Sequence, residues 1–366
     1  MTPQLIFLIS TAISVIVCSV VLRLAQKYSL AMQKPRERDL HQKPTSRLGG
    51  LAVVASFIVT VLIFTIVLPK ASSDFGFPFA VWGISIDKRL LGILIATIFL
   101  SVVMLVDDFK GLPPYTKLVA QILTALILIA AGVGITYLNN PFGLVIKLDN
   151  IAWPIQIGAD VYHFVFFADM LFVVWLVLLT NATNFIDGLD GLAGSLSFVA
   201  AVILGVMSLQ MGQISTAILA SIFAGSILGF LFFNLPPARI FLGDTGSMFL
   251  GMMLAVLTFV TGGKLATVFA VFALVIIDAF YVIVKRIIRR QNPFTTADQT
   301  HLHHRFLRAG FSNQGALITI IIFSFTFGLA TLYLEPKAKL ITIGILTILT
   351  IGMFIILDLK RQKIKS

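Results

Sequence analysis

Long apolar stretches, each about the length of a membrane helix, follow one another along the whole chain. About 20 apolar residues cross the hydrocarbon core of a bilayer as an α-helix. The pattern therefore predicts an all-α, polytopic integral membrane protein with about eleven spans, near residues 4–22, 48–68, 90–106, 117–138, 164–183, 192–209, 214–233, 247–261, 266–286, 315–334 and 338–357. No linker divides them, so residues 1–366 are predicted to form one transmembrane domain. Residues 139–163 alternate apolar and polar, which predicts a short hairpin outside the membrane.

Composition supports this interpretation and narrows the partners. Hydrophobic residues make up 58% of the chain and charged residues 12%, whereas a soluble domain carries about 25% charge. The single cysteine, Cys18, excludes an internal disulfide. The net charge of +11 would suggest nucleic-acid binding in a soluble protein. Here the basic residues cluster between spans, so membrane orientation and anionic ligands are the better explanations, and no nucleic-acid partner is expected.

The distribution of lysine and arginine predicts which end faces the cytoplasm. Twenty of the 27 basic residues lie after odd-numbered spans or in the C-terminal tail. By the positive-inside rule, the N-terminus is outside and the C-terminus is cytoplasmic. Four polar motifs then fall on the same cytoplasmic side: Asp107–Asp108, residues 184–190, Gly243–Asp244 and residues 301–305.

Two of these motifs are rich in carboxylates. Asp107 and Asp108 end an apolar run, where a carboxylate is costly and commonly serves as an ion ligand or proton acceptor. The alternative is a helix end that reaches headgroup water and pairs with Lys110. Further along, Asn181, Asn184, Asp187 and Asp190 recur every three residues, so on a helix they would share one face. Their oxygens suit Mg²⁺, although a purely structural polar stripe is the alternative.

The remaining motifs suggest anion binding. The segment from Gly243 to Ser247 combines a tight turn with Asp244 and hydroxyl groups that could receive phosphate, although it could equally be an ordinary turn. Residues 301–305, with sequence His-Leu-His-His-Arg, lack the usual zinc spacing and suit phosphate oxygens better. A solvated loop is the alternative. The early loop carries Arg38 and His41, which either bind a nucleotide or lipid phosphate or only enforce orientation.

Taken together, these residues resemble the polyprenyl-phosphate N-acetylhexosamine-1-phosphate transferases, glycosyltransferase family 4. The resemblance covers roughly residues 35–310. It rests on Arg38…His41…Arg47-Leu-Gly-Gly50, Asp107-Asp108, Asn181-x-x-Asn184-x-x-Asp187-Gly-x-Asp190-Gly-Leu-Ala, Phe241-Leu-Gly-Asp244-x-Gly-Ser and His301-x-His303-His304-Arg305. The form His-x-His-His-Arg is similar to the bacterial GlcNAc-1-phosphate branch. Asp39 and Lys34 depart from the family pattern, which puts the roles of the first loop in doubt.

The resemblance implies a magnesium-dependent phosphoglycosyl transferase of the bacterial cytoplasmic membrane, with its site on the cytoplasmic face. It would transfer GlcNAc 1-phosphate from UDP-GlcNAc to undecaprenyl phosphate, giving GlcNAc-diphospho-undecaprenol and UMP and initiating an envelope polysaccharide or teichoic acid. Mg²⁺, or Mn²⁺ in its place, would be held by Asp244 and Asn184. The sequence does not fix the oligomeric state, for which a homodimer is one alternative.

The resemblance also implies roles for single residues. Asp107 would take the proton from the attacking lipid phosphate or orient it, and Asp108 would support it. A covalent aspartyl intermediate is the competing mechanism. The other implied contacts are to substrate: Asp187, Asp190 and Phe241 to the uridine end, His301, His303, His304 and Arg305 to the pyrophosphate or sugar, and Lys117 to a phosphate.

Two other functions stay open at this point. A phospho-MurNAc-pentapeptide transferase of peptidoglycan synthesis performs the same chemistry on a donor that carries a peptide. A transporter would also place carboxylates in the membrane, but it usually places them near the midplane and in repeated halves. Here the polar motifs gather at one face, and repeated halves are not apparent in the sequence.

Overall fold

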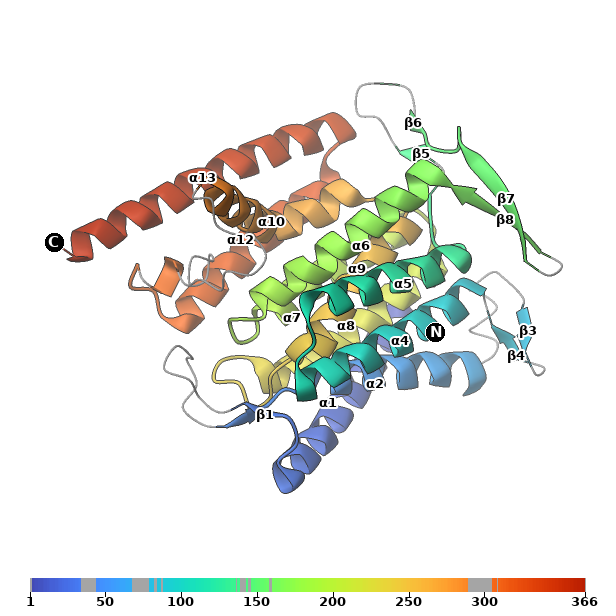
Figure 1. Cartoon of the computed structure of the whole chain (residues 1–366), viewed down its shortest axis with the longest axis horizontal. Coiled ribbons are helices and arrows are strands. Elements are labelled where there is room, and N and C mark those ends of the chain that lie inside the picture. Colours follow the sequence, from blue (N-terminus) through green and yellow to red (C-terminus); the bar gives the residue numbers. More distant parts are fainter. Residues whose placement is uncertain are drawn as a thin grey trace.

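The apolar stretches fold into a bundle of long helices (Figure 1). The computed structural model describes residues 2–33, 44–67, 79–81, 84–86, 88–135, 137–138, 143, 146–157, 160–288, 305–307 and 309–365. The helices are α1 (Pro3–Tyr28), α2 (Gly49–Leu62) with the π-helical turn η1 (Ile63–Val67), α4 (Lys88–Lys110), α5 (Pro114–Ala130), α6 (Phe166–Ile186), α7 (Leu192–Gln210), α8 (Ile214–Asn234), α9 (Gly243–Val260), α10 (Leu265–Ile288), α12 (Asn313–Tyr333) and α13 (Pro336–Lys365).

Each predicted span overlaps one of these helices, which confirms a polytopic, mainly helical membrane protein. The span predicted for 117–138 ends too late, because α5 ends at Ala130 and the apolar residues after it form a turn and strand β5. Among the described residues, eight helices are long and apolar enough to cross a membrane. Three shorter apolar helices cover Gly49–Thr65, Pro114–Ala130 and Leu265–Asp278. Eleven crossings and the predicted orientation remain predictions. The predicted ends of α1 and α13 are too early, because an apolar run marks the hydrocarbon core, whereas the helix continues beyond it.

Small β-elements lie outside the helices, so the all-α prediction is wrong in detail. Strands β7 (Ala152–Ile157) and β8 (Asp160–Val165) form an antiparallel hairpin with Ala152 opposite Val165. This confirms the hairpin expected in residues 139–163, shifted toward α6. Three shorter antiparallel pairs join β1 (Met32–Gln33) to β2 (Thr45–Ser46), β3 (Phe79–Val81) to β4 (Ile84–Ile86), and β5 (Tyr137–Leu138) to β6 (Ile146–Lys147).

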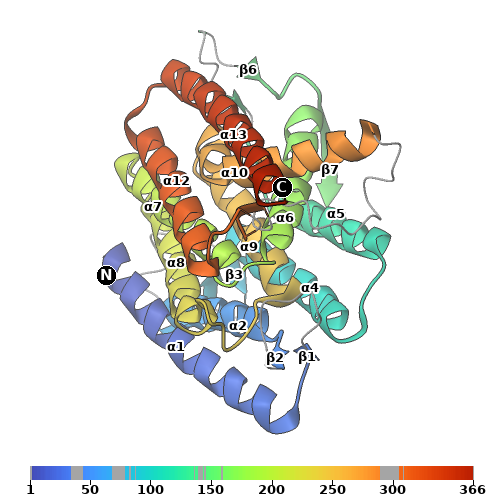
Figure 2. The same cartoon turned by 90° about the vertical axis from the view of Figure 1, so that its left-hand side faces the viewer.

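Helix α9 lies at the centre of the bundle. In its apolar window 89% of the residues are buried, against 22% in α1 and 17% in α13. It packs against α2, α4, α6, α7, α8 and α10, and Figure 2 shows it surrounded by its neighbours. Because its first turn is enclosed by other helices, the side chains there meet groups from distant parts of the sequence.

Small residues let the peripheral helix α1 approach α8 closely. A Cβ added at Gly229 would lie 2.4 Å from Ser14 Cβ and 2.7 Å from the Thr11 carbonyl oxygen. The Ser14 hydroxyl donates a 2.6 Å hydrogen bond to the Ser226 carbonyl oxygen, and Ser10 bonds the α8 backbone one turn away. Gly225 and Gly229 thus form the small-residue face on which membrane helices commonly pack.

Replacing Gly229 with alanine should destabilise the protein by about 1–3 kcal/mol, because the new methyl group overpacks this interface. The measurement is thermal unfolding of purified protein in detergent. The matched control is Gly344→Ala, since a Cβ at Gly344 meets no atom within 4 Å. That control should be neutral or slightly stabilising. Equal melting temperatures for the two variants would contradict close α1–α8 packing.

Candidate active site

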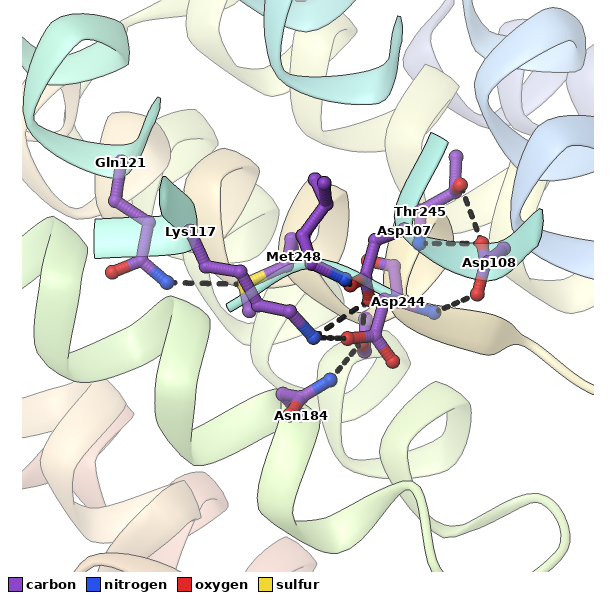
Figure 3. A network of polar contacts seen from close by, with 10 residues as sticks. Asp107, Asp108, Lys117, Gln121, Asn184, Asp244, Thr245 and Met248 are labelled. Carbon is purple, nitrogen blue, oxygen red and sulfur yellow. Dashed lines mark hydrogen bonds and ion pairs between the residues drawn. The ribbon is translucent and has the colours of Figure 1, made fainter. Parts of the chain in front are cut away.

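The polar motifs converge at one end of the bundle, around the first turn of α9 (Figure 3). Asp107 and Asp108 occupy the last turn of α4, Lys117 the first turn of α5 and Asn184 the last turn of α6. Asp244 lies in the first turn of α9. Four helices therefore bring together side chains that are up to 137 positions apart in the sequence.

Lys117 joins the two carboxylates that face each other across the cluster. Its Nζ lies 2.6 Å from Asp107 Oδ2 and 2.5 Å from Asp244 Oδ2. The second oxygen of Asp107, Oδ1, accepts a 2.5 Å hydrogen bond from the Leu112 backbone N–H. Two carboxylates at such close range repel each other unless a cation lies between them. Lys117 and Asp244 stay 24% and 19% exposed, so an incoming ligand can reach this ion bridge.

Asp108 points in a different direction and binds the start of α9. Its Oδ1 accepts a 2.8 Å hydrogen bond from the Asp244 N–H. Its Oδ2 accepts one from the Thr245 N–H at 3.0 Å and one from the Thr245 hydroxyl at 2.6 Å. The residue before α9, Leu242, has no capping side chain. Asp108 therefore caps α9 from another helix and satisfies N–H groups that a helix start leaves free.

The amide stripe of α6 faces α5 and α9. Asn184 Nδ2 donates to Ser247 Oγ at 3.0 Å, and Asn181 Nδ2 donates to Gln121 Oε1 at 3.1 Å. The Thr183 hydroxyl binds the Ser247 carbonyl oxygen at 2.7 Å. These bonds fix the amide of Asn184 beside the first turn of α9.

The predicted four-residue helical stripe is wrong in its second half, because α6 ends at Ile186. Asp187 takes the C-cap position, and Asp190 lies in the following turn, where its Oδ2 accepts a 3.1 Å hydrogen bond from the Ala238 N–H. Gly191, with φ +77°, completes the break in the helix. Asp190 therefore fastens the loop between α8 and α9.

Asp187 nevertheless shares the electrostatic environment of the cluster. Burial raises its pKa well above the usual value of a carboxyl, and the negative charges of Asp244 and Asp108 raise it further. Arg47 opposes this shift only in part. Among the described residues of the cluster, carboxylates outnumber cations, an arrangement typical of sites that bind a cation.

Backbone contacts hold the start of α9 against the start of α2. The Phe241 N–H donates to the Ser46 carbonyl oxygen at 2.8 Å, and the Gly49 N–H donates back to the Phe241 carbonyl oxygen at 2.9 Å. A Cβ at Gly50 would lie 2.1 Å from the Gly246 nitrogen. The glycines of the Arg47-Leu-Gly-Gly50 motif are therefore required for close packing, and the partly buried ring of Phe241 lies at this junction.

Arg305 occupies a different environment from the carboxylate cluster. Its side chain is 3% exposed, and its guanidinium lies 4.4 Å from the ring centroid of Tyr281 and 4.8 Å from that of Phe354. These cation–π contacts join α10 to α13. The contact between Arg305 and the substrate remains a prediction. The other predicted ligands of the histidine loop and the first loop lie outside the described residues: His301, His303, His304, Arg38 and His41.

The oxygen donors fit a magnesium ion better than a transition metal. In the described part of the chain, the structure has no group of three or more histidine, cysteine, aspartate or glutamate side chains arranged as a metal centre. Mg²⁺ does not need one, because it commonly binds through one or two carboxylates, waters and substrate phosphates. Asp244 and Asp107 already share one cation, Lys117, and Asn184 lies beside them. These residues therefore suit Mg²⁺.

Sequence reasoning missed several polar groups that fix the site. Gln121, one helical turn after Lys117, donates to Met248 Sδ at 3.2 Å and accepts from Asn181. The sequence could have indicated Gln121, because a residue four positions after Lys117 in the same helix lies on the same face as the lysine. Thr245 and Ser247, predicted to bind phosphate, are bonded to Asp108 and Asn184 respectively.

Comparison with known proteins gives the family. The model of glycosyl transferase family 4 matches residues 90–262, which include both Asp107–Asp108 and Asp244. A "probable undecaprenyl-phosphate N-acetylglucosaminyl 1-phosphate transferase" of Bacillus subtilis is 30% identical over 96% of this chain and 90% of its own length. A decaprenyl-phosphate N-acetylglucosaminephosphotransferase of Mycolicibacterium smegmatis is 30% identical over 90% of this chain and 82% of its own.

Members of the peptidoglycan branch match less closely. A phospho-N-acetylmuramoyl-pentapeptide-transferase of Geobacillus sp. is 28% identical over 90% of this chain and 95% of its own length. The matches to GlcNAc phosphotransferases extend along nearly the whole chain, with the carboxylate cluster inside the matched family model. The chain therefore belongs to glycosyl transferase family 4.

Proposed function

We propose that this membrane protein transfers N-acetylglucosamine 1-phosphate from UDP-GlcNAc to a polyprenyl phosphate, with undecaprenyl phosphate as the acceptor. The observation that carries the proposal is the convergence of Asp107, Asp244, Lys117 and Asn184 from four helices on one partly exposed point. Phosphoryl transfer needs this combination, because negative charge must be balanced and the reacting oxygens must be held in line. The names of the similar GlcNAc phosphotransferases give the transferred sugar phosphate and the lipid class.

Both substrates of the proposed reaction, the lipid phosphate and the nucleotide sugar, are anions. An oxygen of the lipid phosphate attacks the phosphorus that bears the sugar. The bond from that phosphorus to the oxygen shared with UMP breaks, and UMP leaves. Asp107, whose Oδ2 lies 2.6 Å from the Lys117 ammonium, accepts or orients the proton of the lipid phosphate. The Lys117 ammonium is close enough to the same point to neutralise charge on non-bridging oxygens.

The ion-binding part of the proposal rests on Asp244 and Asn184. The Asn184 amide nitrogen is committed to Ser247 Oγ, which leaves the amide oxygen as the end of the side chain suited to a cation. A bound Mg²⁺ would screen the charge of the diphosphate and polarise its oxygens. Asp187 adds negative charge nearby, and with Asp190 and Phe241 it is proposed to face the uridine end.

Donor competition tests the proposed function directly. Purified protein with undecaprenyl phosphate and Mg²⁺ should release UMP from UDP-GlcNAc and form a lipid-linked sugar diphosphate. UDP-GalNAc and UDP-MurNAc-pentapeptide should react at least about 100-fold more slowly, as expected where polar groups of a site recognise one sugar. Release of UMP with the muramyl donor alone would instead assign the peptidoglycan reaction. No UMP from any of the three would exclude the transferase.

Asp244→Asn keeps the size of the side chain but removes its charge. We expect turnover to fall by about 100-fold or more, because a positioned charge at the reacting phosphates is lost. The control is Asp169→Asn, a buried carboxylate that accepts a 2.8 Å hydrogen bond from the Val165 N–H at the start of α6. Both variants are compared for UMP release at several Mg²⁺ concentrations. An unchanged Mg²⁺ dependence in Asp244→Asn would show that Asp244 does not bind the ion.

Asp187 should make the stability of the ligand-free protein depend on pH. Its pKa is raised in the folded state, so the folded protein binds the proton more tightly than the unfolded chain does. Stability is therefore lost as pH rises from the ordinary carboxyl pKa through the raised value. Asp187→Asn removes this loss. The melting temperature of the variant minus that of the wild type should increase with pH, and a difference independent of pH would contradict the charge crowding.

A further inference from the structure

Adjacent residues in a helix point about 100° apart, so the side chains of Asp107 and Asp108 leave α4 in different directions. Asp107 faces Lys117. Asp108 instead accepts hydrogen bonds from the backbone of Asp244 and from both the backbone and the hydroxyl of Thr245. Its side chain is 8% exposed, and both of its oxygens are occupied by these donors.

We infer that Asp108 is a positioning residue, which fixes the Asp244 carboxylate relative to Asp107 by capping α9 from the last turn of α4. The inference rests on the proposed function for its link to turnover. The cap itself rests on three hydrogen bonds between α4 and α9 alone.

The cap acts on the backbone from which the Asp244 side chain extends. One oxygen of Asp108 accepts the N–H of Asp244 itself, and the other holds Thr245 through two donors. Asp107 is covalently next to Asp108. The separation between the two facing carboxylates is therefore set through a single peptide unit of α4 and three hydrogen bonds, rather than through long flexible side chains.

The residues at the start of α9 provide no side-chain cap of their own. Gly243, with φ +70°, would bring a Cβ to 2.8 Å from Asp108 Oδ1. Gly246 lies against the Gly50 backbone, since a Cβ there would be 2.6 Å from Gly50 Cα. A side chain at either position would disrupt the packing, and the residue at the cap position, Leu242, has no hydrogen-bonding side chain, so the capping group comes from α4. The negative charge of Asp108 also suits the positive end of the α9 dipole.

This role makes Asp108 a poor candidate for a covalent nucleophile or a general base. A nucleophile must direct a lone pair at the reacting phosphorus, whereas both Asp108 oxygens are directed at donors of α9. Asp107 also has both oxygens bonded, but its Oδ2 is held by the 24% exposed side chain of Lys117 rather than by the backbone of α9, so it is the carboxylate left for proton transfer.

The test compares Asp108→Asn with Thr245→Val, which removes only the hydroxyl that reaches Asp108. Hydrogen exchange of the full-length protein, followed by mass spectrometry, reports the amides of residues 242–248 without needing turnover. Both variants should speed exchange there by about 10-fold or more, as expected for a lost helix cap. Exchange in the rest of α9 should stay unchanged. Thr245→Ser keeps the hydroxyl and should restore wild-type exchange.

The matched control is Thr258→Val, which makes the same substitution in the same helix. Thr258 is buried, and its hydroxyl bonds only its own helix, at the Leu254 carbonyl oxygen. This variant should leave both the exchange of residues 242–248 and turnover unchanged. Faster exchange throughout the protein in Asp108→Asn would show general unfolding and overturn the local role.

The turnover of these variants distinguishes a positioning role of Asp108 from a catalytic one. UMP release should fall about 100-fold in Asp108→Asn, as expected for a shift of about 1 Å in a reacting group. It should fall less in Thr245→Val, and the double variant should resemble Asp108→Asn, because both changes break one cap. The pH profile of the residual activity should be that of the wild type. Lost turnover with wild-type exchange, or additive losses, would place Asp108 in the chemistry and overturn the inference.

The two proposals fail in different ways. If the wild type releases no UMP from any donor while Asp108→Asn still exposes residues 242–248 to exchange, the proposed function fails and the cap stands as a structural feature. If the wild type is active but exchange in Asp108→Asn is unchanged, the positioning role fails and the proposed function stands.

Discussion

Negative charge gathered at one end of an apolar bundle is the constraint on which the rest of the site depends. Asp107 and Asp244 share the ammonium of Lys117. Asp108 is neutralised differently, by three hydrogen-bond donors at the positive end of α9. Burial raises the pKa of Asp187, the charges of Asp244 and Asp108 raise it further, and Arg47 offsets this only in part. The charge balance of the cluster therefore favours the binding of a further cation, as expected for an enzyme that must bring two phosphate-bearing substrates together.

Such a cluster needs rigid support, because a small displacement of one carboxylate would change every charge interaction around it. The support is mainly backbone. Segments near Ser46 and Gly49 form hydrogen bonds with Phe241, and Gly50 lies directly against Gly246. Asp190 fastens the preceding loop at the Ala238 N–H. In a membrane, where apolar burial gives little preference for one helix arrangement, close backbone approach and interhelical hydrogen bonds are the interactions that specify geometry.

Hydrophobic periodicity predicted the helices, and their alternation across the membrane predicted that Asp107, Asn184 and Asp244 would meet. Helix rotation could not be predicted in the same way. Whether Asp107 or Asp108 faces the cluster depends on a 100° difference that the packing of α4 against α9 decides. The end of α6 could have been predicted from the sequence, since Gly188 and Gly191 follow Asp187. The regular spacing of polar residues favours a continuous helix instead, so the predicted stripe runs past the true end of α6 at Ile186.

In the proposed mechanism the paired aspartates have different tasks. Asp107 would exchange its resting contact with Lys117 when a phosphate approaches. A group that fixes a helix start must keep its contacts throughout. Placing the two tasks on consecutive residues of α4 gives each its own direction while the rigid helix keeps their separation constant. The exchangeable contact is then the more exposed ion bridge, and the permanent one is the buried cap.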